Sequence, residues 1–189
     1  KLKKFERNYP LLLEMLKEEP NRLRWRVHII QELNNVQKWE EMQTFCQESI
    51  QATTDCTDKE DYRDIGTFYA GLLTSLVERH LYDAAFAVEK ALEMDKRLSR
   101  LCRVYCALLL ARLHFARRDC AATRKQLDIY EEGGRYLGGH EDEREEQESA
   151  LLVGAALDEM NRRRALSLRI GCGLLEDDTS VLRENYEGL

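Results

Sequence analysis

Apolar side chains recur with the period of an α-helix along nearly the whole chain. Trp25, Ile29 and Leu33 are each four residues apart, and Phe68 and Leu72 repeat that spacing further along. Spacings of three and four residues place side chains on one face of a helix, whereas a half-buried strand alternates every second residue. The pattern therefore predicts an all-α protein.

Prolines, glycines and charged runs indicate where the predicted helices begin and end. Asn8-Tyr9-Pro10 is expected to open the first helix, because proline at a first helical position loses no hydrogen bond. Pro20 is expected to end it, since the residue before a proline avoids helical backbone angles. Gly133-Gly134 and Gly138-Gly139 are expected to stop helices. Arg162-Arg163-Arg164 is expected at the C-terminal side of a helix, where cations are favourable.

The predicted helices pair into hairpins, because helices joined by only a few residues must lie antiparallel to each other. The helix containing Leu101 to Phe115 is apolar nearly all round, which predicts that it is covered on more than one side. The expected fold is one α–α superhelix, or solenoid, of about four antiparallel helical hairpins. The hairpins are expected at residues 22–50, 62–95, 98–132 and 141–175.

Composition then narrows the classes of function. The 35 acidic and 29 basic side chains give a formal charge of -6, which argues against a general nucleic-acid binder. No apolar run reaches the roughly 18 residues of a membrane span, so none is expected. The chain lacks a starting methionine and an apolar signal segment, and we expect a fragment of a longer cytoplasmic protein. Its six cysteines, without a Cys-x-x-Cys pair, are expected to be reduced thiols.

No motif predicts a catalytic centre. Cys102, Cys106, His114 and Cys120 have the chemistry of zinc ligands, but structural zinc ligands usually come in tight pairs on turns, so buried packing is the favoured interpretation. The glycine loops that hold phosphates are absent from the sequence. Arg162-Arg163-Arg164, with Arg117-Arg118, suits either an anionic partner or a solvated helix end. We predict no catalytic residue, no cofactor and no metal.

Parts of the chain resemble tetratricopeptide repeats. Ala84-x-x-x-Val88-x-x-Ala91-Leu92 resembles the second helix of such a repeat, where small residues let helices approach closely. Pro20 precedes Trp39 by 19 residues, the family's spacing between a closing proline and the aromatic residue of the next turn. The turn positions, Trp39, Tyr82 and Cys120, are 43 and 38 residues apart, more than the nominal repeat of about 34. Three side chains, Ile30, Met42 and Leu72, are larger than the family pattern.

The opening of the chain resembles a second family. The run Lys4-Phe5-Glu6-Arg7-Asn8-Tyr9-Pro10-Leu11-Leu12-Leu13-Glu14 is similar to a junction in bacterial family 2 glycosyltransferases, between the transferase domain and tetratricopeptide-like hairpins. The resemblance implies a non-catalytic C-terminal region that supports dimerisation or acceptor binding. The family's Asp-x-Asp metal site is not carried over, because Glu141-Asp142-Glu143 and Asp177-Asp178 do not follow an apolar strand.

The tetratricopeptide resemblance implies a concave groove lined by the first helix of each hairpin. The side chains expected in this groove are Arg24, Gln31, Asn34, Tyr69, Tyr105 and Arg112. Ordinary packing between helices is the alternative role for the same residues. The predicted function is a non-enzymatic module that binds a protein or peptide in the groove, with a homodimer as one possibility. The glycosyltransferase accessory region is the alternative function.

Overall fold

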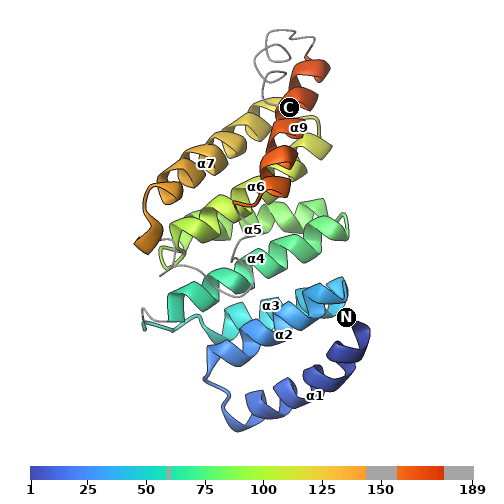
Figure 1. Ribbon diagram of the computed structural model, residues 1–189, viewed down its shortest axis with the longest axis vertical. Coiled ribbons are helices and arrows are strands. Elements are labelled where there is room, and N and C mark those ends of the chain that lie inside the picture. The colour runs from blue at the N-terminus through green and yellow to red at the C-terminus, as the bar shows by residue number, and fades with distance from the viewer. Residues whose placement is uncertain (59–60, 144–156, 177–189) are drawn as a thin grey trace.

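The computed structural model describes residues 1–58, 61–143 and 157–176, and within these ranges it contains α-helices and no strand (Figure 1). The all-α prediction is therefore confirmed. The helices are α1 (Leu2–Glu18), α2 (Leu23–Asn35), α3 (Trp39–Ala52), α4 (Tyr62–Glu78), α5 (Tyr82–Met94), α6 (Arg100–Ala116), α7 (Cys120–Gly138) and α9 (Glu159–Leu175).

The helices form an array in which each one packs against its neighbours in the chain. Helices that are not consecutive in the chain also pack together. The helix α4 packs against both α2 and α6, and α9 packs against both α6 and α7. Figure 1 shows the helices stacked from α1 at one end to α9 at the other. The helices α2, α4 and α6 therefore form one continuous layer of successive contacts.

Three turns between helices have the same backbone conformation. Gln37, His80 and Arg118 adopt the left-handed region, with φ of 60°, 58° and 60°. The N–H of the following residue donates to a carbonyl five residues earlier in each turn, over distances of 3.0, 2.9 and 3.0 Å. This pattern closes the C-terminus of one helix and reverses the chain within four residues. The next helix begins two residues after the left-handed residue, at the turn positions Trp39, Tyr82 and Cys120 singled out in the sequence.

The start of α1 differs from the prediction. Pro10 lies inside this helix, which begins at Leu2, so the expectation that Asn8-Tyr9-Pro10 opens it is wrong. Contacts with α2 and within α1 hold the residues before the proline, since Asn8 donates a 3.0 Å hydrogen bond to Glu32 of α2. Phe5 is buried and stacks on Tyr9 with 4.7 Å between ring centroids. These contacts keep the backbone helical despite the hydrogen bond that proline removes.

Glycine-rich α7 also continues where a stop was expected. The helix runs through Gly133-Gly134 and ends at Gly138, so the first glycine pair is not a helix stop and the second is. A Cβ atom at position 133 would lie 2.3 Å from Cγ2 of Val104 on α6. Glycine at this position therefore permits a close approach of two helices rather than a break in one.

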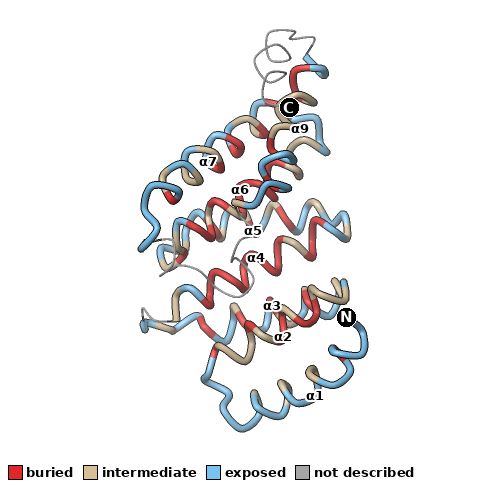
Figure 2. The backbone as a smooth tube through the Cα atoms, in the orientation of Figure 1, coloured by how far each residue is buried: buried red, intermediate tan, exposed pale blue. Residues whose placement is uncertain are grey.

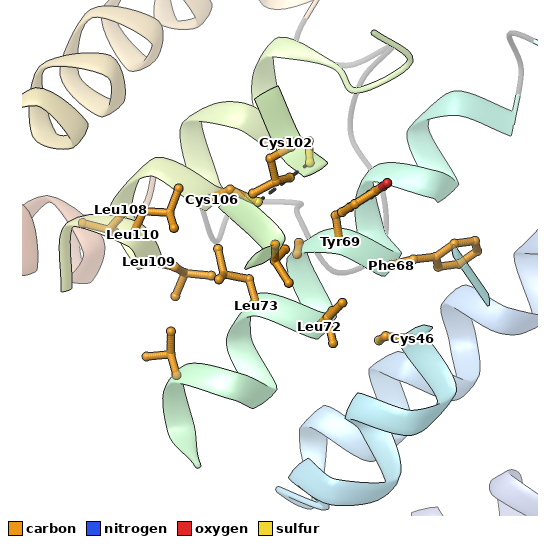
Figure 3. Close-up of a cluster of buried hydrophobic side chains, with 14 of the residues drawn as sticks. Cys46, Phe68, Tyr69, Leu72, Leu73, Cys102, Cys106, Leu108, Leu109 and Leu110 are labelled. Carbon is orange, nitrogen blue, oxygen red and sulfur yellow. Dashed lines mark hydrogen bonds between the residues drawn. The ribbon is translucent and has the colours of Figure 1, made fainter. Parts of the chain in front are cut away.

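Half of the buried apolar side chains among the described residues lie on α4 and α6, in the middle of the array (Figure 2). Both faces of α6 are covered, because it packs against α4, α5, α7 and α9. The prediction that this helix is covered on more than one side is confirmed. Figure 3 shows Leu72 and Leu73 of α4 in the same buried cluster as Leu108, Leu109 and Leu110 of α6.

The C-terminal helix corrects the placement of an arginine run. Arg162, Arg163 and Arg164 lie in the first half of α9, near its N-terminus, and not at the C-terminal side of a helix as expected. Asp158 caps this N-terminus, since its side chain accepts a 2.7 Å hydrogen bond from the N–H of Asn161. Part of the first helix of the expected hairpin at 141–175 falls within residues 144–156, outside the described residues.

Candidate functional site

The predicted groove residues lie on the layer formed by α2, α4 and α6. Arg24, Gln31 and Asn34 belong to α2, and all three are half-buried. Tyr105 and Arg112 belong to α6, one on each side of the middle of that helix, and both are half-buried. The array therefore brings side chains that are far apart in the sequence, on α2 and on α6, to one layer of helices.

Tyr69 is the exception among these residues. Its side chain is buried, and its hydroxyl donates a 3.2 Å hydrogen bond to the carboxylate of Asp95, beyond the end of α5. Burial raises the pKa of Tyr69 to about 12, with the neighbouring Asp95 charge acting in the same direction. Tyr69 is drawn among the buried side chains in Figure 3, so the expectation that the groove exposes it is wrong.

Two ion pairs join the helices of this layer. Arg24 on α2 lies 3.7 Å from Asp64 on α4, and Arg112 on α6 lies 3.0 Å from Glu78 at the end of α4. Both arginines keep part of their surface in solvent, with 42% and 34% of each side chain exposed. The layer therefore presents guanidinium groups that are paired and still accessible.

Asp64 is a residue of this layer that the sequence analysis missed. Its side chain is buried, and its Oδ1 has no hydrogen-bond partner among the described residues. Burial raises the pKa of the Asp64 carboxyl, and the nearby Arg24 and Arg63 oppose that effect. An acidic residue inside an otherwise apolar helical stretch was the available signal, because buried carboxylates are rare unless they are paired.

A second concave feature lies between α5 and α7, over α6. This pocket has a volume of about 130 Å³, with Cys106, Ala107 and Leu110 among the side chains that line it. Glu89 also lines it, and its Oε1 accepts hydrogen bonds of 2.9 Å from Gln126 and 3.3 Å from His114. The pocket is therefore a small gap between three helices, in which side chains of α6 and α7 hold the carboxylate of Glu89 in place.

The cysteines belong to different packing clusters. The sulfur atoms of Cys102 and Cys106 are 4.0 Å apart on one face of α6 (Figure 3). Cys120 instead contacts the backbone oxygen of Cys172 on α9. His114 hydrogen-bonds to Glu89, so the four residues considered as zinc ligands do not come together. Within the described part of the chain, no three His, Cys, Asp or Glu side chains are grouped as metal ligands would be.

Comparisons with known proteins add no family to this description. The chain matches no protein-family model, no curated protein and no solved structure. Among the described helices, none is both long enough and apolar enough to cross a membrane.

Proposed function

We propose that this chain is a tetratricopeptide-like helical-repeat module, an α–α superhelix that binds a protein or peptide partner along the layer of α2, α4 and α6. The observation that supports the proposal is the repetition of one turn geometry at Gln37, His80 and Arg118, combined with successive contacts between α2, α4 and α6. Stacked hairpins of this kind expose an extended surface formed by the first helix of each pair.

The charges on this layer indicate the chemistry of the partner. Arg24 and Arg112 are accessible and paired with carboxylates of the same layer. The pair of Arg112 with Glu78 is partly exposed, and such pairs contribute only about 0–1 kcal/mol, so a partner carboxylate can replace Glu78 at little cost. Asp64 is buried, so a partner carboxylate would join Arg24 without displacing Asp64. Tyr105 lies on the same layer, packed against the core and half-buried, and the exposed part of its ring is available for an apolar contact. The expected partner is therefore a segment with acidic side chains and at least one apolar contact.

The first test places a photo-crosslinking amino acid at position 24 or position 112. The matched control carries it at Lys90, an exposed residue on α5, outside the layer. We expect both groove positions to crosslink to the same partner in cells and the control position to give no such product. A product joining two copies of this chain would identify the partner as a homodimer. Equal crosslinking from all three positions would contradict a groove on α2, α4 and α6.

The second test measures affinity once that partner is purified. Arg112→Glu reverses a charge on the layer and is expected to weaken binding at least tenfold, or about 1.4 kcal/mol. Lys90→Glu makes the same change of charge away from the layer and is expected to leave the affinity unchanged. Circular dichroism checks that both variants remain folded. An equal loss of affinity in both variants would show a general effect of charge and would contradict binding along the layer of α2, α4 and α6.

A further inference from the structure

A pocket of about 370 Å³ lies between α7 and the start of α9, at the end of the array opposite α1 (Figure 1). Tyr130 and Arg135 of α7 and Arg162 of α9 line it, together with Gly134 and Gly138. These residues are separate from the layer of α2, α4 and α6. The proposed function therefore gives this pocket no role.

Tyr130 is the buried polar group of this pocket. Only 3% of its surface is exposed, and its hydroxyl has no hydrogen-bond partner among the described residues. Burial raises the pKa of Tyr130 to about 12, so the hydroxyl keeps its proton at neutral pH and is a donor. A buried donor without an acceptor destabilises a folded protein, and such groups are uncommon unless a ligand uses them.

The two arginines of the pocket differ from their neighbours. Arg163 pairs with Glu159 at 2.9 Å, and Arg164 donates to the side chain of Asn161 at 3.0 Å. For the side chains of Arg135 and Arg162, by contrast, the described residues provide no ion pair or hydrogen bond. The pocket thus contains two guanidinium groups whose charge no described carboxylate balances through a contact.

The acidic residue that lines the pocket already forms an ion pair with an arginine of α9. Glu131 also lines the pocket, but Arg169 binds both of its oxygens, at 2.7 and 2.9 Å. These bonds raise the pKa of Arg169 and hold Glu131 in an ion pair across α7 and α9. Both oxygens of Glu131 are therefore bound to Arg169, which also pairs with Asp128 at 2.6 Å, and Glu131 forms no ion pair with Arg135 or Arg162.

The position of Arg162 adds to the positive potential. It lies in the second turn of α9, close to the helix N-terminus, where the helix dipole is positive. Three arginines near this end of a helix oppose the dipole, and within the described residues at the start of α9 the acidic side chains are Asp158 and Glu159. A bound anion would relieve this repulsion.

The glycines leave room for a ligand. Gly134 and Gly138 are one helical turn apart, so they lie on the same face of α7. A Cβ atom at position 138 would have no neighbour within 4 Å, and the wall of the pocket is open there. A Cβ atom at position 134 would instead lie 3.0 Å from Leu157, which also lines the pocket, so the open part of this face is at Gly138.

We propose that this pocket binds a phosphate group, with the guanidinium groups of Arg135 and Arg162 paired to its oxygens and the Tyr130 hydroxyl as a third donor. Guanidinium groups bind tetrahedral oxyanions through two parallel N–H bonds, which favours phosphate over a chloride ion. The whole chain carries a formal charge of -6 and repels anions in general, so binding depends on these three side chains. The phosphate belongs either to a small phosphate ester or to a phosphorylated side chain of a partner.

The test titrates the full chain with inorganic phosphate at constant ionic strength, with sodium chloride as the reference, and follows heat release and Tm. We expect saturable binding and a rise in Tm that chloride does not reproduce. Arg162→Ala and Arg135→Ala each weaken phosphate binding at least tenfold. Arg163→Ala is the matched control, because it removes the same charge one residue away and leaves the affinity unchanged.

Tyr130→Phe separates binding from stability. Without phosphate, the variant is expected to melt at the same temperature as the wild type or higher, because the buried donor is gone. With phosphate, it is expected to lose about tenfold in affinity, the usual effect of removing one hydrogen bond to a charged group. A purely structural hydroxyl would instead lower the Tm and leave phosphate binding intact, which would overturn the proposal.

Two further probes distinguish the sources of the phosphate. Phenyl phosphate binding at least as tightly as inorganic phosphate supports the pocket and identifies a small ester. A phosphoserine peptide that binds tenfold more tightly than phenyl phosphate supports it and identifies a phosphorylated partner. No saturable binding of any of the three probes above the chloride reference, or an equal loss in Arg163→Ala and Arg162→Ala, would overturn the proposal.

Discussion

Asp95 illustrates how one side chain joins separate layers of the array. Its carboxylate accepts hydrogen bonds from the guanidinium and the backbone N–H of Arg97 and from the hydroxyl of Tyr69 on α4. Arg97 also donates to the backbone oxygen of Thr53, beyond the end of α3. Arg103 on α6 donates to the carbonyls of Leu92 and Asp95 at the end of α5, both at 2.7 Å. The loop between α5 and α6 is therefore attached to three helices or their ends.

Replacing Asp95 tests this connection. Asp95→Asn is expected to destabilise the chain by about 2–3 kcal/mol at pH 7, because Arg97 then lies largely buried without its counter-ion. The bonds from Arg97 lower the pKa of Asp95 below its ordinary value. The folded-state pKa is thus below the unfolded one, and the stabilisation is present above pH of about 4 and lost as the pH falls through the folded pKa. The stability difference between wild type and variant should shrink in urea unfolding measured from pH 6 to pH 3.

Asp83→Asn serves as the control for this measurement. Asp83 pairs with Arg117 on the surface, and 95% of its side chain is exposed. The same change of charge is therefore expected to cost less than about 0.5 kcal/mol at every pH. If both variants lost the same stability, the network around Asp95 would contribute no more than a surface pair.

The residue scale also shows which parts of the site the sequence was able to predict. Arg24 and Arg112 lie on α2 and α6 and are partly exposed, as the helical period and the order of helices predict, and their role in binding stays a prediction. Tyr69 was misplaced by the same reasoning, because its direction depends on a partner beyond α5 that no local pattern reveals. Asp64 and Arg135 were missed, because the burial of Asp64 and the place of Arg135 in a pocket depend on residues from other helices. Periodicity predicts a face of a helix, and only packing shows what covers that face.

At the scale of elements, the three repeated turns carry a conformational cost. Gln37, His80 and Arg118 adopt positive φ without being glycine, which a side chain makes less favourable. The turn hydrogen bonds and the packing of the helices that follow offset this cost. The resemblance to tetratricopeptide repeats placed turns at Trp39, Tyr82 and Cys120, although none of the three breaks contains the glycine that usually marks such a turn.

Gly133 provides the prediction at this scale, because it sets the distance between α6 and α7. Gly133→Ala introduces a Cβ atom 2.3 Å from Cγ2 of Val104, so either the buried Val104 side chain must change its rotamer or the two helices must move apart. We expect a loss of about 1–3 kcal/mol, the usual cost of overpacking. Gly138→Ala is the matched control, because its Cβ atom meets nothing within 4 Å. Thermal unfolding should show a lower Tm for the first variant and an equal or higher Tm for the second, since alanine favours a helix.

Either result for Gly133 bears on how glycines in this chain are interpreted. A glycine that ends a helix in the left-handed region would tolerate alanine poorly, but neither Gly133 nor Gly138 has a positive φ, although α7 ends at Gly138. A contact position tolerates alanine only where space allows. Equal destabilisation by both substitutions would therefore contradict the close approach of α6 and α7 as the reason for Gly133.

At the scale of the whole molecule, the array is unevenly anchored. Among the residues of α1, only Phe5 is buried, whereas ten residues of α6 are. The hydrogen bond from Asn8 to Glu32, at 3.0 Å, adds one polar link between α1 and α2. Segments with few buried apolar contacts open locally at a smaller free-energy cost than the core does. The end of the array at α1 should therefore unfold independently of its middle.

Two alanine variants compared by hydrogen exchange test this difference. Phe5→Ala is expected to remove the protection of amides in α1 while leaving α4 and α6 protected, because it deletes the one buried side chain of that helix. Leu108→Ala, on α6, is expected to cost about 2–5 kcal/mol and to lower protection in α4 and α7 together, because α6 packs against both. Leu11→Ala controls for the change in α1, since Leu11 is 55% exposed and its loss leaves the contacts of Phe5 in place. If Phe5→Ala lowered protection throughout the array, α1 would belong to the same cooperative unit as α6. The layer of α2, α4 and α6 would then depend on α1 for its shape, and a variant at either end would change the surface along which we propose that a partner binds.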